Sequence, residues 1–126
     1  MRLLLAIALV ALPASVAAEV VPLRHGTYVR AGTPCADPPF AAMREWDGIG
    51  MADPHSHACR ARLLARRGAS YTISNSCIGT GVGPGVRTSE RLTVVPARQG
   101  MRLNGTAFHF CPTASLPPEL RRRAVR

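Results

Sequence analysis

The residues best suited to chemistry lie in one short segment, 51–59, which reads MADPHSHAC. His55 and His57 offer imidazole nitrogens and Met51 offers a thioether, a donor set that suits copper. A structural zinc site would need four ligands in tighter pairs such as Cys-x-x-Cys, and the sequence contains no such pair. Copper binding by His55, His57 and Met51 is therefore one hypothesis. A polar turn with two solvated histidines explains the same residues more simply.

Residues for covalent or acid–base catalysis are present, but they form no catalytic pattern. No serine lies in a Gly-x-Ser-x-Gly turn, and the glycine-rich segment 79–85 lacks the Lys-Ser/Thr ending of a phosphate-binding loop. Carboxylates occur at Asp37, Glu45, Asp47 and Asp53, in or beside predicted loops, and no spacing places two of them across a cleft. We therefore expect a non-catalytic protein without a cofactor. A small hydrolase built on the two histidines and the acidic loops is the alternative.

Arginine dominates the charge, because all 16 basic residues are arginine, against 7 acidic residues. Four of them, Arg60, Arg62, Arg66 and Arg67, gather in the segment 58–67, where they could bind anionic envelope components such as phosphorylated lipid headgroups. No aromatic residues are interleaved with these arginines, so a nucleic-acid partner is not expected. The lack of lysine also suggests a GC-rich bacterial coding bias, and a solvated basic surface of that origin is the alternative.

The first 18 residues have the order of a secretory signal peptide. Arg2 precedes an apolar run over residues 3–12, Pro13 ends the run, and Val16, Ala17 and Ala18 provide the small residues at a cleavage site. The run is too short to remain as a membrane anchor, so we expect no transmembrane segment after cleavage. The sequence thus predicts a periplasmic or secreted protein.

Four cysteines remain after cleavage, and an even number in an exported chain indicates two disulfides. If 58–67 and 71–77 pair as strands, Cys59 lies almost opposite Cys77, which favours a Cys59–Cys77 bridge and leaves Cys35 with Cys111. The main alternative joins Cys35 to Cys59 and Cys77 to Cys111. Closing the long Cys35–Cys111 loop should stabilise the fold by about 4 kcal/mol.

The clearest strand is 71–77, where Tyr71, Ile73, Asn75 and Cys77 alternate with smaller polar residues. With a returning arm over 87–95, it predicts a hairpin. Segment 58–67 is favoured as a strand over a helix, and 26–30 predicts a further strand. Segment 101–111 is either a hairpin through Asn104-Gly105 or one longer strand with a bulge. For 40–51 we expect a short helical turn over 40–46 and then a strand over 46–51, with Trp46 in the core.

Together these patterns predict an all-β fold, a small antiparallel meander or barrel of about five to six short strands with one short helix, stapled by two disulfides. The predicted organisation is a signal peptide over 1–18, a single disulfide-bonded β domain over 19–111, and a flexible tail rich in proline and arginine over 112–126. The function that fits best is a non-catalytic binding or envelope-associated module with a preference for anionic ligands. The sequence does not predict the oligomeric state.

Overall fold

The computed structural model describes residues 11, 13, 18–79, 83 and 85–122. The predicted signal peptide over 1–18 therefore lies almost entirely outside the described residues, as do most of the glycine-rich segment 79–85 and the last four residues of the chain. Val20 and Val21 are the first of the described residues that contribute to the core.

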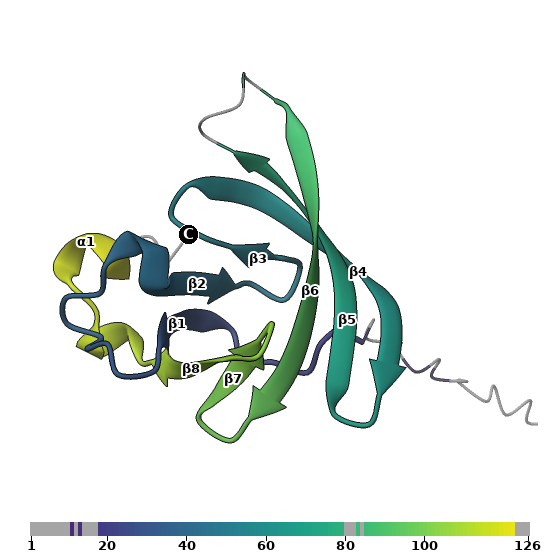
Figure 1. Ribbon diagram of the computed structural model, residues 1–126, viewed down its shortest axis with the longest axis horizontal. Coiled ribbons are helices and arrows are strands. Elements are labelled where there is room, and N and C mark those ends of the chain that lie inside the picture. Colours follow the sequence, from purple (N-terminus) through teal and green to yellow (C-terminus); the bar gives the residue numbers. More distant parts are fainter. Residues whose placement is uncertain (1–10, 12, 14–17, 80–82, 84, 123–126) are drawn as a thin grey trace, which may run out of the picture.

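The fold is all-β, and its eight strands form one antiparallel sheet in the order β3-β2-β1-β8-β7-β6-β5-β4, rolled into a nearly closed barrel (Figure 1). The strands are β1 (Gly26–Arg30), β2 (Met43–Trp46), β3 (Met51–Ala52), β4 (Ser56–Arg67), β5 (Ser70–Gly79), β6 (Arg87–Ala97), β7 (Gly100–Leu103) and β8 (Thr106–Cys111). The prediction of an antiparallel barrel is confirmed. The number of strands is higher than the five to six expected, because two of the predicted strands are tight hairpins.

The first of these hairpins is β7–β8. Asn104 and Gly105 both adopt positive φ angles, 49° and 81°, as a type I′ turn requires, so the hairpin alternative for 101–111 is correct. The second is β2–β3. Phe40–Ala42 forms the expected helical turn as a 3-10 helix (η1), but the strand that follows covers Met43–Trp46 and not 46–51. Asp47 ends this strand, since its Oδ1 accepts hydrogen bonds from the backbone N–H groups of Ile49 and Gly50.

The barrel closes where the edge strands β3 and β4 approach each other. The Ala61 N–H donates to the Ile49 carbonyl at 2.7 Å, and the buried Asn75 side chain bonds both backbone groups of Met51. Gly50 is required at this seam, because an added Cβ would lie 2.3 Å from the Cys59 backbone. The Asn75 amide therefore substitutes for a strand partner in the barrel wall.

The barrel core is formed by the inward residues of the strands. Tyr71, Ile73, Asn75 and Cys77 are all buried and alternate with half-buried residues along β5, which confirms the predicted alternation. Trp46 is 1% exposed and lies in the same core, as expected, although its Nε1 has no hydrogen-bond partner among the described residues.

The two disulfides join Cys35 to Cys111 and Cys59 to Cys77, which confirms the favoured pairing. The Cys59–Cys77 bridge connects β4 to β5, so the preference for a strand over a helix in 58–67 is also confirmed. The Cys35–Cys111 bridge ties the loop after β1 to the end of β8.

A second, smaller core lies outside the barrel, on the outer face of β1, β2 and β8. It contains Val29, Ala42, Met43, Cys111 and Leu116. Leu116 stands between a second 3-10 helix, η2 (Thr113–Ser115), and the short helix α1 (Pro118–Arg121), and it is only 2% exposed. This part of the segment predicted as a flexible tail therefore packs against the barrel, and the one short α-helix of the described residues lies here.

Candidate functional site

Arginines converge on the outer face of the three long strands, which we call the outer β4–β6 face. Residues directly opposite each other on antiparallel strands project from the same side of a sheet. Ser74 lies opposite Arg62 on β4 and Arg91 on β6, and Ser76 lies opposite Arg60 and Ser89. Because Tyr71, Ile73, Asn75 and Cys77 point inward, these partners point outward.

The outer β4–β6 face therefore combines guanidinium groups with hydroxyl groups. Arg62 and Arg91 flank Ser74 with one strand between them, so their Cα atoms are about 10 Å apart. Arg87 pairs with Ile78 on the same face, and its Nη1 donates to the carbonyls of Ala58 and Ser76 at 2.8 and 3.0 Å. Among the described residues, no hydrogen bond or ion pair involves the side chains of the other arginines of this face, Arg60, Arg62, Arg67 and Arg91.

Acidic groups are missing from the outward positions of these three strands. The one carboxylate side chain on these strands is that of Glu90. Glu90 lies opposite Asn75, which points inward, so its side chain projects from the inner face of the sheet. The positive charge of the outer β4–β6 face is thus not neutralised by its own strands.

The four arginines of segment 58–67 that were predicted to bind anions do not all lie on one face. Register shifts in β4 leave Leu64 without a partner, since Leu63 lies opposite Ile73 and Ala65 lies opposite Thr72. A bulge of this kind moves every later residue to the other face. Arg66 consequently lies on the inner side, stacked over the Tyr71 ring at 4.9 Å, while Arg67 returns to the outer side opposite Ser70.

The candidate arginines that sequence reasoning missed are Arg87 and Arg91. They belong to the returning arm of the predicted hairpin, 87–95, and the alternation of that arm is visible in the sequence. Only the register between β5 and β6 places them beside the arginines of β4.

The predicted copper ligands are separated by the fold. Met51 lies opposite Trp46 on the inner face and is 2% exposed in the barrel core. His57 is exposed on the outer side, and the His55 ring instead packs edge-on to Phe40, with 6.3 Å between ring centroids. The thioether and the two imidazoles therefore do not form one donor set.

His57 lines the same groove as three of the carboxylates predicted as candidates. A groove of about 370 Å³ opens on the outer side of β2 and β3, and its polar lining includes His57, Glu45, Asp47, Asp53 and Thr27. The Oδ1 atom of Asp53 accepts a hydrogen bond from the His55 N–H, and the Oδ1 atom of Asp47 accepts one from the Ile49 N–H. The fourth predicted carboxylate, Asp37, does not line this groove.

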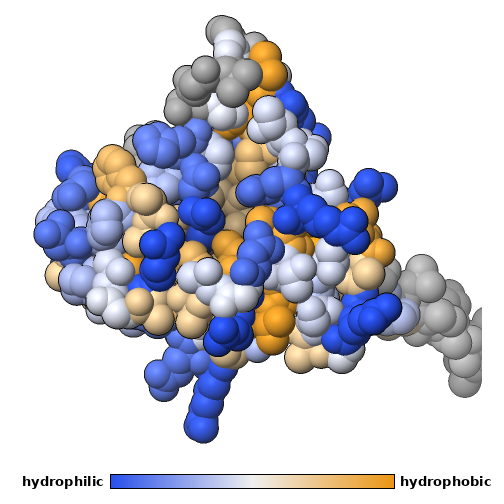
Figure 2. Space-filling model, in the orientation of Figure 1, coloured by the Kyte–Doolittle hydropathy of each residue, from blue (hydrophilic) through white to orange (hydrophobic). Residues whose placement is uncertain are grey.

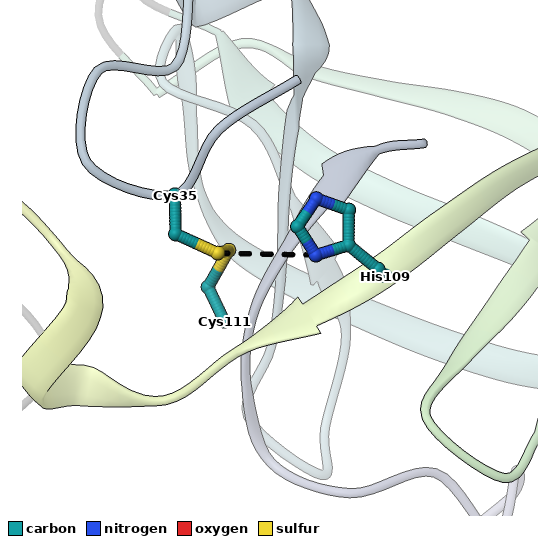
Figure 3. Close-up of side chains that lie close together, drawn as sticks. All are labelled: Cys35, His109 and Cys111. Atoms are coloured by element: carbon teal, nitrogen blue, oxygen red, sulfur yellow. Dashed lines mark hydrogen bonds between the residues drawn. A yellow bond between two sulfur atoms is a disulfide. The ribbon is translucent and has the colours of Figure 1, made fainter. Parts of the chain in front are cut away.

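A third cluster joins the disulfide Cys35–Cys111 to His109 (Figure 3). The Nδ1 atom of His109 lies 3.8 Å from Cys35 Sγ, and its Nε2 lies 2.8 Å from the Thr33 carbonyl oxygen. Among the described residues, this is the one group of three histidine, cysteine or acidic side chains whose ligand atoms lie close enough to hold a metal, within 4.8 Å of one another.

Hydropathy indicates no broad apolar docking area on the face shown in Figure 2, where hydrophilic residues separate smaller hydrophobic areas. No helix in the described part of the chain is long and apolar enough to span a membrane.

The sheet and the disulfides place the protein in the class of small, disulfide-bonded, nearly closed antiparallel β-barrels. Its two disulfides fit an extracellular or otherwise oxidising compartment. No protein-family model matches the chain, and comparisons with curated proteins and with solved structures found no match.

Proposed function

We propose that this protein is an exported bacterial binding module, periplasmic or secreted after cleavage behind Ala18, whose outer β4–β6 face binds anionic envelope components. The observation that carries the proposal is the convergence of Arg60, Arg62, Arg87 and Arg91 on one face without an acidic residue at its outward positions. N-terminal sequencing of the exported protein should begin at Glu19.

The chemistry of this face suits phosphate-bearing headgroups. Guanidinium groups bind phosphate through two parallel hydrogen bonds, and the serines between them add hydroxyl donors. A membrane surface presents many headgroups side by side, so arginines spaced about 10 Å apart can each find an anion. Each arginine near an anionic surface contributes about 1 kcal/mol.

The test measures binding to vesicles that contain an anionic phospholipid, against purely zwitterionic vesicles. The triple variant Arg60→Gln, Arg62→Gln and Arg91→Gln should bind about 100-fold more weakly than the unaltered protein at low salt. A control triple variant, Arg30→Gln, Arg98→Gln and Arg102→Gln, loses the same charge from exposed residues outside this face. It should lose much less affinity.

Equal losses in the two triple variants would contradict the proposal, because net charge alone would then explain the binding. Binding that disappears completely at physiological salt would support the alternative of a solvated basic surface, since exposed charges are screened beyond about 8 Å under those conditions. Retention on an acidic polysaccharide but not on vesicles would redirect the proposal to glycans.

The groove on β2 and β3 supports a hydrolase as the second candidate. Its lining combines His57 with Glu45, Asp47 and Asp53, and an imidazole and carboxylates in one groove suit acid–base chemistry. Turnover of generic esters or glycosides, lost in the variant His57→Gln and kept in His55→Gln, would establish this function. No turnover by the unaltered protein would remove it.

A further inference from the structure

The disulfide Cys35–Cys111 differs from Cys59–Cys77 in having an imidazole beside it. His109 and Cys111 are two residues apart on β8, so both side chains project from its outer face, and Cys35 reaches them from the loop after β1. Figure 3 shows the His109 ring pointing at the sulfur pair. The neighbours of Cys59–Cys77 are instead the Ser56 hydroxyl and the Asn75 amide.

The orientation of His109 is that of a metal ligand. A carbonyl oxygen only accepts hydrogen bonds, so the Nε2 atom that lies 2.8 Å from the Thr33 oxygen carries the hydrogen. In the neutral ring, Nδ1 then has a lone pair, and that lone pair faces Cys35 Sγ. Metal-binding histidines commonly have this arrangement, in which the second nitrogen donates to a backbone carbonyl.

The surroundings suit a soft cation with few ligands. Cys111 is 1% exposed and packs with Val29, Met43 and Leu116 in the second core, whereas Cys35 is only partly buried. Apolar side chains surround Cys111 on one side of the sulfur pair, and the partly exposed Cys35 leaves a path for a reductant and an ion on the other. Thiolate and imidazole donors select Cu(I) over harder metals.

We propose that the reduced form of Cys35–Cys111, together with His109, binds one Cu(I) ion through two sulfurs and one nitrogen. A dithiol reductant transfers two electrons and two protons to the disulfide, giving two cysteine thiols and a cyclic disulfide of the reductant. The ion then replaces the two thiol protons, which go to solvent, and Nδ1 supplies the third ligand. In the oxidised protein the sulfurs are joined and the site is closed.

The site differs from a copper site on His55 and His57, and it does not depend on the anionic ligand proposed above. In the experiment, the full-length mature protein is reduced with a dithiol, separated from it without oxygen, and titrated with Cu(I) against bicinchoninate. We expect one equivalent to bind to the reduced protein and none to the oxidised protein. The variant His109→Gln should bind at least about tenfold more weakly. The control His57→Gln should bind like the unaltered protein.

Reduction could also open Cys59–Cys77 and unfold the chain, so circular dichroism is recorded with and without Cu(I). The double variant Cys59→Ala, Cys77→Ala leaves only the proposed thiols and should retain the bound equivalent. Equal affinity in His109→Gln and unaltered protein would overturn the proposal, including the case in which an unfolded chain binds Cu(I) through its thiols alone. Absence of Cu(I) binding by the reduced protein would overturn it as well.

Discussion

At the scale of single residues, buried polar side chains form hydrogen bonds with backbone groups that would otherwise lack a partner. Asn75 is fully buried, and its amide accepts from the Met51 N–H at 3.0 Å and donates to the Met51 carbonyl at 2.7 Å. An unpaired buried backbone group costs about 1–3 kcal/mol, so these bonds allow the short strand β3 to sit at the seam. Tyr28 plays a comparable part, since its hydroxyl donates to the Arg24 carbonyl at 2.6 Å.

The ionisation of Tyr28 predicts a loss of stability at alkaline pH. Burial raises its pKa from 10.0 to about 12, against the opposing effect of the Arg24 charge. Because the folded state favours the neutral phenol, the stabilisation is fully present below pH 10 and is lost as the pH rises from 10 to about 12. The free energy of unfolding, measured by urea denaturation, should fall by about 2 kcal/mol over this range.

The variant Tyr28→Phe is the control for that prediction. Phenylalanine does not ionise, so the unfolding free energy of this variant should change much less over the same pH range. An equally steep alkaline loss in Tyr28→Phe would show that another group is responsible.

At the scale of elements, two features decide what the sheet presents to solvent. The first is the bulge at Leu64, which divides β4 into a part that exposes Arg60 and Arg62 and a part in which Arg66 turns inward. The second is the segment formed by η2 and α1, which covers the outer face of β1, β2 and β8. Figure 1 shows this segment at the end of the barrel away from β4 and β5.

The covering segment contributes to stability mainly through Leu116. Replacing this 2% exposed residue in Leu116→Ala should lower the free energy of unfolding by about 2–4 kcal/mol, because a cavity remains in the second core. The matched control is Leu64→Ala on β4, where the side chain is 41% exposed and the change should be about 0.5 kcal/mol or less. Equal and small effects in the two variants would mean that residues 113–121 do not stabilise the domain.

At the scale of the whole molecule, the two disulfides constrain the chain to different extents. Cys35–Cys111 closes a loop with a sequence separation of 76, and Cys59–Cys77 closes one of 18. The loss of chain entropy in the unfolded state grows with loop length. The longer bridge also holds the loop after β1 against the second core, since Cys111 belongs to this core and Cys35 packs against it.

Removing the bridges one at a time should reveal this difference. The pair Cys35→Ala, Cys111→Ala should lose about 4 kcal/mol of unfolding free energy, and the pair Cys59→Ala, Cys77→Ala about 3 kcal/mol. Thermal and urea denaturation of both oxidised variants would measure the two losses. A larger loss from the shorter bridge would show that the closure of the barrel seam beside Cys59 outweighs loop entropy.

Local patterns in the sequence were sufficient for the class of fold. The alternation over 71–77, the Asn104-Gly105 turn and the four cysteines predicted an antiparallel, disulfide-bonded barrel, because strand period and turn chemistry depend on neighbouring residues. The favoured disulfide pairing followed from one correct strand assignment in 58–67. The arginines of β4 were also recognised as candidates from the sequence alone.

Only the tertiary structure decided which chemical groups meet. The bulge at Leu64 separates Arg66 from Arg60 and Arg62, and the register of β6 adds Arg87 and Arg91 to that face. Likewise, His109 meets Cys35 across 74 residues of sequence. Such contacts depend on strand register and on packing between distant segments, and a shift of one residue reverses the face of every side chain that follows.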